Sequence, residues 1–424
     1  MFGPLFSAGL VLPFSTLPSA QAAPETHITD EAALIPDHGE ALRIELLVPE
    51  GGRVAQGQPV MRLRDTPGIA LVAPMAGQVA RIELRPGRQL LQAVLFHDAR
   101  GDRYRFDTST AARGPDGLRA LLQQSGLWRM FRSRPFGHPP KVAEVAAAIF
   151  VMGVDTRPNA AAPAVALAGR EADFERGLAA LAGFAAGPIF FCEPGKARYG
   201  GAVPSQITRL QAGALHPQGA AGLLIHRQFP ARIAAPVWDI AAEDVADLGA
   251  VLETGYLPPT RLVAIAGDAL RETRLVRCQP GADLRGLTQS LVRPGPHDIL
   301  SGAFLDGRAA HWLAPRDRQV TVLSRAAQPK LRHWFGAALD QAAIAMPIIP
   351  TAALEQAMGG AAFPVAAMIR ALATRDTEAF TKLGGLSLVE EDVALADYVT
   401  GARPRLADQL RAMLNQIAKE EDAA

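Results

Sequence analysis

Short runs of apolar residues alternate with polar ones over the first hundred positions, and turn residues such as Gly51-Gly52 and Pro86-Gly87 separate the runs. A period of two between turns predicts β-strands. Strands this short and evenly spaced are typical of a small sandwich or barrel. We expect the strands within residues 41–49, 59–65, 69–74, 77–84 and 91–97.

Between residues 110 and 255 the pattern changes to continuous apolar runs that alternate with amphipathic segments. Helical spacing of apolar residues predicts helices over residues 170–185 and 241–255, the second ending at Gly255. This alternation predicts a parallel sheet with helices packed on it. The apolar runs predict buried strands at residues 147–155, 187–193 and 221–226.

Residues 258–325 return to strand-like runs, with a helical patch at Leu284–Leu291, and fit a small α+β unit. After about residue 330 the pattern is helical, for instance over 361–374 and 404–421. A chain of 424 residues is too long for one ordinary core. We therefore expect four domains, with the bounds 1–108, 109–256, 257–326 and 327–424.

Charge and cysteine content exclude several classes of function. The chain has 43 basic and 42 acidic residues, so no basic excess is present to neutralise nucleic acid phosphates. Cys192 and Cys278 are the two cysteines, and each stands alone in its neighbourhood. Four cysteines of this chain therefore cannot build a zinc or iron–sulfur site, and we expect two core thiols.

The first 24 residues carry no charged side chain and contain Ala20-Gln21-Ala22, which is similar to a signal-peptide cleavage site. The segment lacks a basic start, however, and three prolines interrupt its apolar run. Composition alone leaves export open. No stretch of about twenty uncharged apolar residues predicts a membrane-spanning helix.

The stretch VAPMAGQVARI, residues 72–82, is typical of domains that carry biotin or lipoate on a lysine at a hairpin tip. The corresponding hairpin here is Thr66-Pro67-Gly68, and the first lysine of the whole chain is Lys141. Neither group can therefore be attached to this block. The sequence therefore predicts the fold of a carrier domain but lacks the lysine that would carry biotin or lipoate.

The segments at residues 125–140 and 147–163 resemble the flavin-binding part of complex I flavoprotein subunits and of the Rnf complex C subunit. In those proteins a run of glycines after SGL brings backbone N–H groups close to the flavin phosphate. Here residues 129–136 read RMFRSRPF, and these large side chains leave no room for a phosphate. The three arginines leave open another mode of anion binding, although a solvated or subunit-facing loop is commoner.

Taken together, the chain resembles the A subunit of the Na+-translocating NADH:quinone oxidoreductase (Na+-NQR). The match runs in family order from about residue 33 to the C-terminus. It is carried by EGGRVAQGQPV (50–60), VAPMAGQVARI (72–82), SGLWRMFRSRPF (125–136), AIFVMGVDTRPNAAAP (148–163), HPQGAAGLLIH (216–226) and EEDVALADYV (390–399). Two departures are the loss of the usual N-terminal lysines and a shorter region between Ser324 and Ala361.

The resemblance implies an α/β plus α+β multidomain protein. Its parts would be a barrel-sandwich hybrid (biotinyl/lipoyl-like) domain, a degenerate Rossmann-like flavoprotein domain, a small β-grasp (SLBB-like) domain and a C-terminal helical domain. It also implies a peripheral subunit on the cytoplasmic side of the bacterial inner membrane, so the signal-peptide interpretation of residues 1–23 is disfavoured. The isolated chain would be inactive, with no catalytic residue and no metal.

The resemblance further implies that FAD, FMN, riboflavin and an iron–sulfur cluster belong to the other five subunits, and that NADH and ubiquinone are substrates of the complex. The membrane subunit at the quinone site would be the main partner. The quinone-associated stretches of the family correspond to residues 36–45 and 132–141. The quinone or docking candidates are therefore His38, Arg132, Arg134, Pro135, Phe136, His138 and Pro139. Alternatively, RPFGHPP is a rigid connector packed on another subunit.

His216 and His226 flank a glycine-containing turn before the run that we expect to be a strand, and we interpret them as a structural pair because no third metal ligand is near. Asp155 and Asn159 follow a strand and are expected to hold the DTRPN turn. The acidic VEEDVALADY stretch is expected to be a solvated helix face. The rival functions are a free-standing small-molecule or quinone-binding protein and an enzyme with its own flavin.

Overall fold

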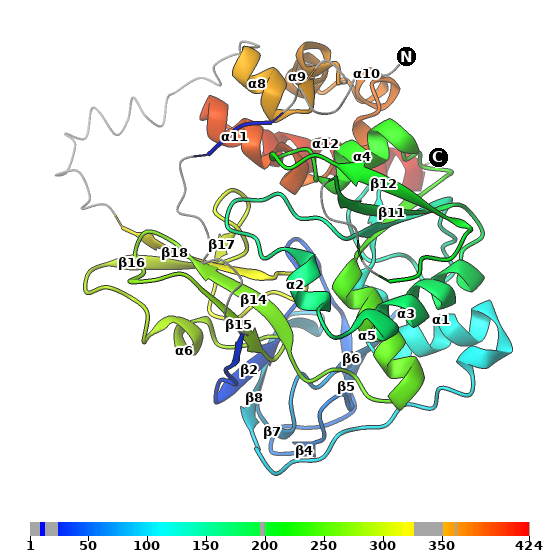
Figure 1. The fold of residues 1–424 in the computed structure, drawn as a ribbon, viewed down its shortest axis with the longest axis vertical. Helices are drawn as coiled ribbons and strands as arrows, with labels where there is room; N and C mark the ends of the chain where they lie inside the picture. Colours follow the sequence, from blue (N-terminus) through cyan, green and yellow to red (C-terminus); the bar gives the residue numbers. More distant parts are fainter. Residues whose placement is uncertain are drawn as a thin grey trace.

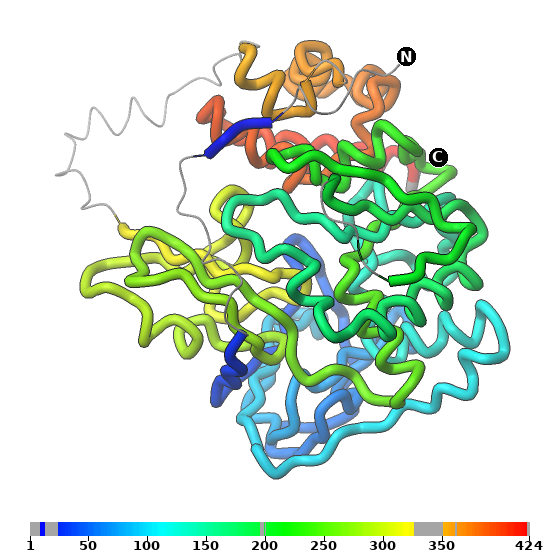
Figure 2. The backbone as a smooth tube through the Cα atoms, viewed as in Figure 1, coloured from blue at the N-terminus to red at the C-terminus, as the bar shows by residue number. Residues whose placement is uncertain are grey.

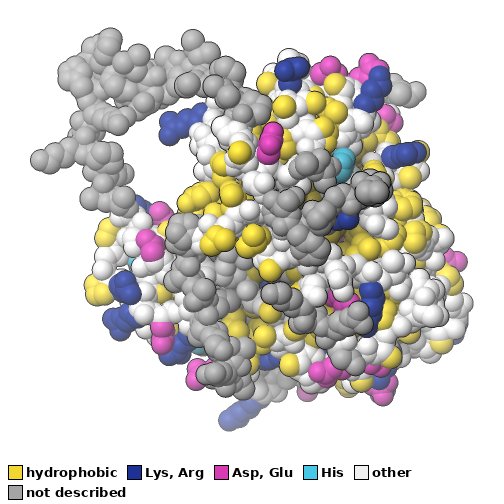
Figure 3. All heavy atoms as spheres, turned by 45° about the horizontal axis from the view of Figure 1, so that its top comes forward, with side chains coloured by type: hydrophobic (Ala, Val, Ile, Leu, Met, Phe, Trp, Pro, Cys, Tyr) yellow, Lys and Arg dark blue, Asp and Glu magenta, His cyan; other side chains and the backbone are white. Residues whose placement is uncertain are grey.

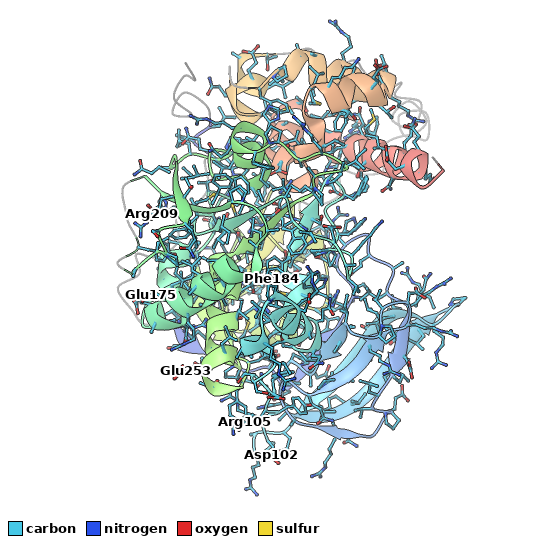
Figure 4. All side chains as sticks on the ribbon, turned by 90° about the vertical axis from the view of Figure 1, so that its right-hand side faces the viewer. Asp102, Arg105, Glu175, Phe184, Arg209 and Glu253 are labelled. Atoms are coloured by element: carbon cyan, nitrogen blue, oxygen red, sulfur yellow. The ribbon has the colours of Figure 1, made fainter. Side chains whose placement is uncertain are left out.

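The protein is described by a computed structural model that covers residues 9–12, 24–195, 199, 201–325, 351–360 and 363–423. Most of the candidate signal segment and of the shortened region between 324 and 361 lies outside these residues. Figure 1 shows the N-terminal β-structure at one end of the molecule and the C-terminal helices at the other, with the α/β part between them. Figure 4 shows the same order from the side.

Two small sheets form the N-terminal barrel. One has the order β2 (Glu31–Leu34), β8 (Gln89–His97), β7 (Gly77–Arg85) and β4 (Arg53–Val54), and the other β3 (Ile44–Leu46), β5 (Pro59–Leu63) and β6 (Ala70–Val72). Their inward residues, for example Val60, Val79 and Leu95, are fully buried. All five predicted strands are present. The pattern missed β2 and β4, which are only four and two residues long.

The α/β part is built on one five-stranded sheet. Its order is β12 (Ile207–Ala212), β11 (Ile189–Pro194), β10 (Ala148–Met152), β13 (Val237–Ala241) and β9 (Arg132–Arg134). All pairs are parallel except β13 with β9. Helices α1 (Pro115–Gln124), α3 (Glu171–Phe184) and α5 (Ala242–Thr254) share the core on one face, and α4 (Ala221–Gln228) packs on the other. The predicted parallel sheet and both predicted helices are confirmed.

The expected strand at 221–226 is wrong, because these residues form helix α4. Leu224 and Ile225 pack on the sheet, whereas Leu223 packs into the core of the C-terminal helices. A short helix buried on both sides has no polar stripe, so its sequence looks like a buried strand.

The third sheet has six strands. Its order is β1 (Glu25–Thr26), β15 (Arg274–Cys278), β14 (Arg261–Ala266), β18 (Gln319–Ser324), β16 (His297–Ser301) and β17 (Arg308–Ala309). The strand-like runs predicted within residues 258–325 are present as strands, and the predicted helical patch contains α6 (Leu284–Thr288). Strand β1 reaches this sheet from the N-terminal segment, and the parallel β14–β18 pair makes the sheet mixed.

The C-terminal part consists of helices around their own core. They are α8 (Ala352–Ala357), α9 (Val365–Thr374), α10 (Thr377–Lys382), α11 (Ala394–Thr400) and α12 (Leu406–Ala423). Leu10 and Leu12 pack against this core, and the Gly9 N–H donates to the Gln356 carbonyl. Figure 2 shows this N-terminal segment beside the C-terminal helices. In the described part of the chain, no helix combines the length and apolar character needed to cross a membrane.

Candidate functional site

A cavity of about 270 Å³ opens at the carboxyl ends of β10 and β13. The chain leaves β10 towards β11 on one side and returns to β13 on the other, so this is the switch point of the sheet. Open α/β sheets bind ligands at such a point. Met152 and Asp155 line the cavity after β10, and Ala241 and Asp244 line it after β13.

Several other parts of the chain complete the cavity. Asp37 and His38 come from the segment between β2 and β3, and Arg132 comes from β9. The remaining walls are the loops around β17 and before β18, and the 3-10 turn Glu390–Val393 with Arg411 of α12. Of the seven quinone or docking candidates, the structure places His38 and Arg132 at this cavity; the other five do not line it.

Arg134 is fully buried where the five-stranded sheet meets the C-terminal helices. We call the contacts of Arg134 with Asp239 and Asp392 the joint between these two parts. The Arg134 Nε donates to Asp239 Oδ1 at 3.0 Å and its Nη1 to Asp392 Oδ2 at 2.7 Å. Burial opposes its charged form, but Asp392 and Asp239 outweigh this and raise the pKa of Arg134. Arg134, a docking candidate from the sequence, is therefore an internal side chain that does not reach the surface.

Arg132 extends the same ion-pair network towards the cavity. Its Nη2 lies 2.9 Å from Asp239 Oδ2, and it also pairs with Glu391. Burial raises the pKa of Asp239, but the positive charges of Arg132 and Arg134 lower it by a larger amount. The pKa of Asp239 is therefore below its usual value. The acidic stretch expected to be a solvated helix face is thus partly internal, because Asp392 is 1% exposed and Asp397 is 7% exposed.

The rest of the connector is anchored to the C-terminal helices. Pro135 is buried, Phe136 packs against the helical core, and the Phe136 carbonyl accepts from Arg411 Nη1 at 2.8 Å. Pro139 is half-buried and His138 is exposed. Among the described residues that line the cavity there is no Phe, Tyr or Trp, so no aromatic side chain is present there to stack on a quinone ring.

The turn after β10 holds several polar groups of the cavity. Asp155 pairs with Arg157 at 2.6 Å, and Arg157 also reaches Asp306 at 3.2 Å. Asn159 adopts a positive φ of 61°, a conformation that Asn tolerates better than most residues. On the opposite wall, Arg318 lies 2.5 Å from Asp244 at the start of α5. The charges that line this cavity therefore largely neutralise one another.

His216 precedes helix α4, and His226 lies in the last turn of that helix. His216 is buried at the cavity, its Nδ1 lies 3.2 Å from Thr156 Oγ1, and burial lowers its pKa to about 4. Its Nε2 has no hydrogen-bond partner among the described residues. His226 contacts Phe363 with ring centroids 4.8 Å apart, and its Nδ1 lies 3.3 Å from the Gly384 carbonyl. No group of three metal-ligating side chains occurs in the residues that the structure describes.

The segment that replaces the glycine loop is part of the hydrophobic core. Trp128 and Phe131 are fully buried and pack on Trp238, with ring centroids 5.3 and 5.5 Å away. The Trp128 Nε1 donates to the Pro140 carbonyl at 2.9 Å. These residues do not fit a flavin phosphate, because side chains occupy the backbone surface that would bind it.

The sequence interpretation missed the two carboxylates that organise the joint, Asp239 and Asp392. Asp239 stands between apolar residues in the strand sequence VWDIA. A carboxylate within a buried strand must be paired, so this position was a recognisable signal for an internal arginine. Asp392 carried no such signal, because its acidic neighbours made it look solvated.

Comparison with known proteins is consistent with this architecture. Residues 6–98 match the NqrA N-terminal barrel-sandwich hybrid domain, and residues 114–257 match the NqrA second alpha/beta domain. The chain is 31% identical to the A subunit of the Na(+)-translocating NADH-quinone reductase of Marinomonas sp. (strain MWYL1), covering 97% of this chain and 98% of the relative. The corresponding subunit of Rhodopirellula baltica is 30% identical, with 97% of both chains covered.

Among solved structures, a chain of an NAD+-reducing [NiFe]-hydrogenase in the air-oxidized state superimposes with a TM-score of 0.39. It is 12% identical, over 72% of this chain and 64% of that chain. Identity of about 30% over nearly the whole length of both chains, shared with several relatives, decides the family. The chain belongs to the NqrA family, the A subunits of the Na(+)-translocating NADH-quinone reductase.

Proposed function

We propose that this chain is a peripheral subunit of the complex on the cytoplasmic side of the membrane, with a structural and docking role at its quinone-reducing end. It holds no redox cofactor of its own. FAD, FMN, riboflavin and the iron–sulfur cluster reside in the five partner subunits, and NADH and ubiquinone are substrates of the whole complex. The division at residues 108, 256 and 326, with a Rossmann-like and a β-grasp (SLBB-like) domain, belongs to the same proposal.

The observation that carries the proposal is that large side chains fill the region where related flavoproteins bind the flavin phosphate. Trp128, Phe131 and Trp238 form one aromatic cluster where related flavoproteins have backbone facing a phosphate. A core packed in this way cannot open to admit a phosphate without losing several kcal/mol of packing energy. Because this aromatic cluster leaves no room for a flavin phosphate, we expect the chain to act as a scaffold of the complex and not as an electron carrier.

A docking role is supported by the rigidity of the connector and by what it leaves exposed. Arg134 fixes the connector to two parts of the molecule, while His138 and His38 remain at the surface. Figure 3 shows hydrophobic side chains gathered on the face that carries the C-terminal helices. Hydrophobic and imidazole groups on a rigid support suit contact with a membrane subunit or with a quinone carbonyl.

The test uses His38→Ala and His138→Ala in the assembled complex, with His97→Ala as the control, since His97 is exposed on the barrel strand β8. NADH oxidation is measured with an artificial acceptor and with ubiquinone separately. We expect the first two changes to lower ubiquinone reduction or retention of this subunit, with NADH oxidation by the artificial acceptor unchanged. Full ubiquinone reduction and normal subunit content in both variants would contradict the docking site.

The large switch-point cavity favours a second candidate, a free-standing small-molecule or quinone-binding protein. His216 Nε2 and Gln319 Oε1 both lie at this cavity and have no partner among the described residues. A polar ligand would satisfy them. Affinity purification of the chain from its own cells separates the two candidates, since the complex predicts co-purification of the partner subunits and the alternative predicts the chain by itself.

A further inference from the structure

A second cavity, of about 120 Å³, lies where the barrel, the α/β part and the six-stranded sheet meet. Its walls are mainly apolar. They include Val72 of β6, Leu127 of the 3-10 turn Leu127–Met130, Leu257 after α5, and Leu313 before β18. An apolar cavity of about 150 Å³ can hold a benzene ring, so this one suits a single ring or a short alkyl chain.

Two arginines stand at the wall of this cavity with unused hydrogen-bond donors. Arg261, at the start of β14, donates Nη1 to the Pro315 carbonyl, and no carboxylate of the described residues lies within ion-pair distance of it. Arg129 is 8% exposed and pairs with Glu40 at 2.5 Å. Among the described residues, the Nε atoms of both arginines lack a partner.

The carboxylates at this cavity already have partners of their own. Asp244 pairs with Arg318 at 2.5 Å, and Asp247 pairs with Arg170 at 2.8 Å. Burial raises the pKa of neighbouring Glu243 to about 7, so part of this carboxyl is neutral at pH 7. Among the described residues, Arg261 is a guanidinium at this cavity without a carboxylate within ion-pair distance, and its Nε has no hydrogen-bond partner. Placing an unmatched cation beside apolar walls is costly unless an anion completes the site.

We propose that this cavity binds a small carboxylate with an apolar body, of the size of benzoate or a short-chain fatty acid. The carboxylate faces Arg261 and Arg129, because a guanidinium offers paired donors that match both carboxylate oxygens. The apolar body packs on Leu127, Leu257 and Leu313. This site adjoins the switch-point cavity, with which it shares Met130 and Asp244 as walls. The inference does not depend on the proposed place of the chain in the complex.

The test is calorimetric titration of the full-length chain with benzoate and hexanoate, and with benzyl alcohol and hexan-1-ol as uncharged counterparts. We expect saturable binding of an acid and at least about tenfold weaker binding of its alcohol, which corresponds to about 1.4 kcal/mol. Equal affinity for acid and alcohol, or no binding of either acid, would overturn the proposal.

Three variants locate the site, after a melting curve has shown that each is folded. Arg261→Gln removes the charge and should weaken acid binding about tenfold. Val72→Phe fills the cavity and leaves both arginines, and it should abolish binding. The control is Arg176→Gln, whose partner Glu253 lies at the far end of α5 (Figure 4) and which does not line the cavity. Unchanged affinity in both Arg261→Gln and Val72→Phe would place the bound acid elsewhere and overturn the assignment.

Discussion

Arg134 and Asp392 form a fully buried ion pair, Nη1 to Oδ2 at 2.7 Å, between residues 258 positions apart in the chain. The pair joins strand β9 of the sheet to the turn that precedes helix α11. Because Arg134 also pairs with Asp239, which Arg132 shares, one guanidinium bridges two carboxylates from separate parts of the molecule. The connector RPFGHPP therefore begins with a side chain that holds two parts of this chain together.

Arg134→Ala should lower the free energy of unfolding by about 3–5 kcal/mol, because it leaves the buried Asp392 without a cation and leaves Asp239 with Arg132 alone. Urea denaturation of the full-length chain measures the change. The control is Arg62→Ala, which removes an exposed pair with Glu45 and should cost less than about 1 kcal/mol. Equal losses of unfolding free energy in the two variants would show that the buried Arg134–Asp392 pair does not stabilise the contact between the two parts.

A methyl group at Gly222 would disturb the same joint from the side of helix α4. A Cβ there would overlap the Asp392 carboxylate, and the Gly222 N–H donates to Asp392 Oδ1 at 2.8 Å. Gly222→Ala should therefore destabilise the protein by about 1–3 kcal/mol. In helix α3, Gly183→Ala meets no atom within 4 Å and should be neutral or stabilising by up to about 1 kcal/mol. Thermal melting of both variants tests the contrast, and stabilisation by both would contradict it.

Acid should destabilise the protein through His216. Its pKa is about 4 in the folded state and about 6.5 in an unfolded chain, so the unfolded state binds more protons between these values. Stability from this group is full above pH 6.5 and falls by about 3 kcal/mol towards pH 4. His216→Asn should remove this slope. Burial raises the pKa of Glu243 to about 7, so protonation of Glu243 stabilises the folded state as the pH falls. This opposite effect is present in both the wild type and His216→Asn, so it cancels in the comparison. Denaturation curves with equal pH slopes in wild type and variant would be inconsistent with a buried neutral imidazole.

The chain should not bind a flavin. Residues 129–136, which replace the glycine run of related flavoproteins, carry large side chains, and Phe131 among them is fully buried against Trp128. Fluorescence titration with FMN, and the visible spectrum of protein purified from its own cells, provide the measurement. We expect no saturable quenching and no flavin absorbance. One flavin per chain would show that the aromatic cluster opens, and the scaffold role would then be wrong.

The sequence predicted most strands and helices of the first three blocks, because their periodicity reflects one buried face. It failed at α4, where burial on both sides removed the polar stripe. It also failed to identify the internal joint, since pairing of Arg134 with Asp392 depends on a contact across more than half of the chain. Of the residues singled out in the sequence, His38, Arg132, Asp155 and His216 line the switch-point cavity, but nothing in the sequence placed them together. The walls of this cavity come from loops of the barrel, the α/β part, the six-stranded sheet and the C-terminal helices. These loops come together only when the four parts pack against one another.

The central claim is that the chain serves the quinone-reducing end of the complex without carrying electrons itself. The most direct measurement compares the complex purified with and without this chain, using NADH with ubiquinone and NADH with an artificial acceptor. The account predicts that loss of the chain abolishes ubiquinone reduction and leaves NADH oxidation by the artificial acceptor intact. Ubiquinone reduction at the normal rate without the chain would contradict it.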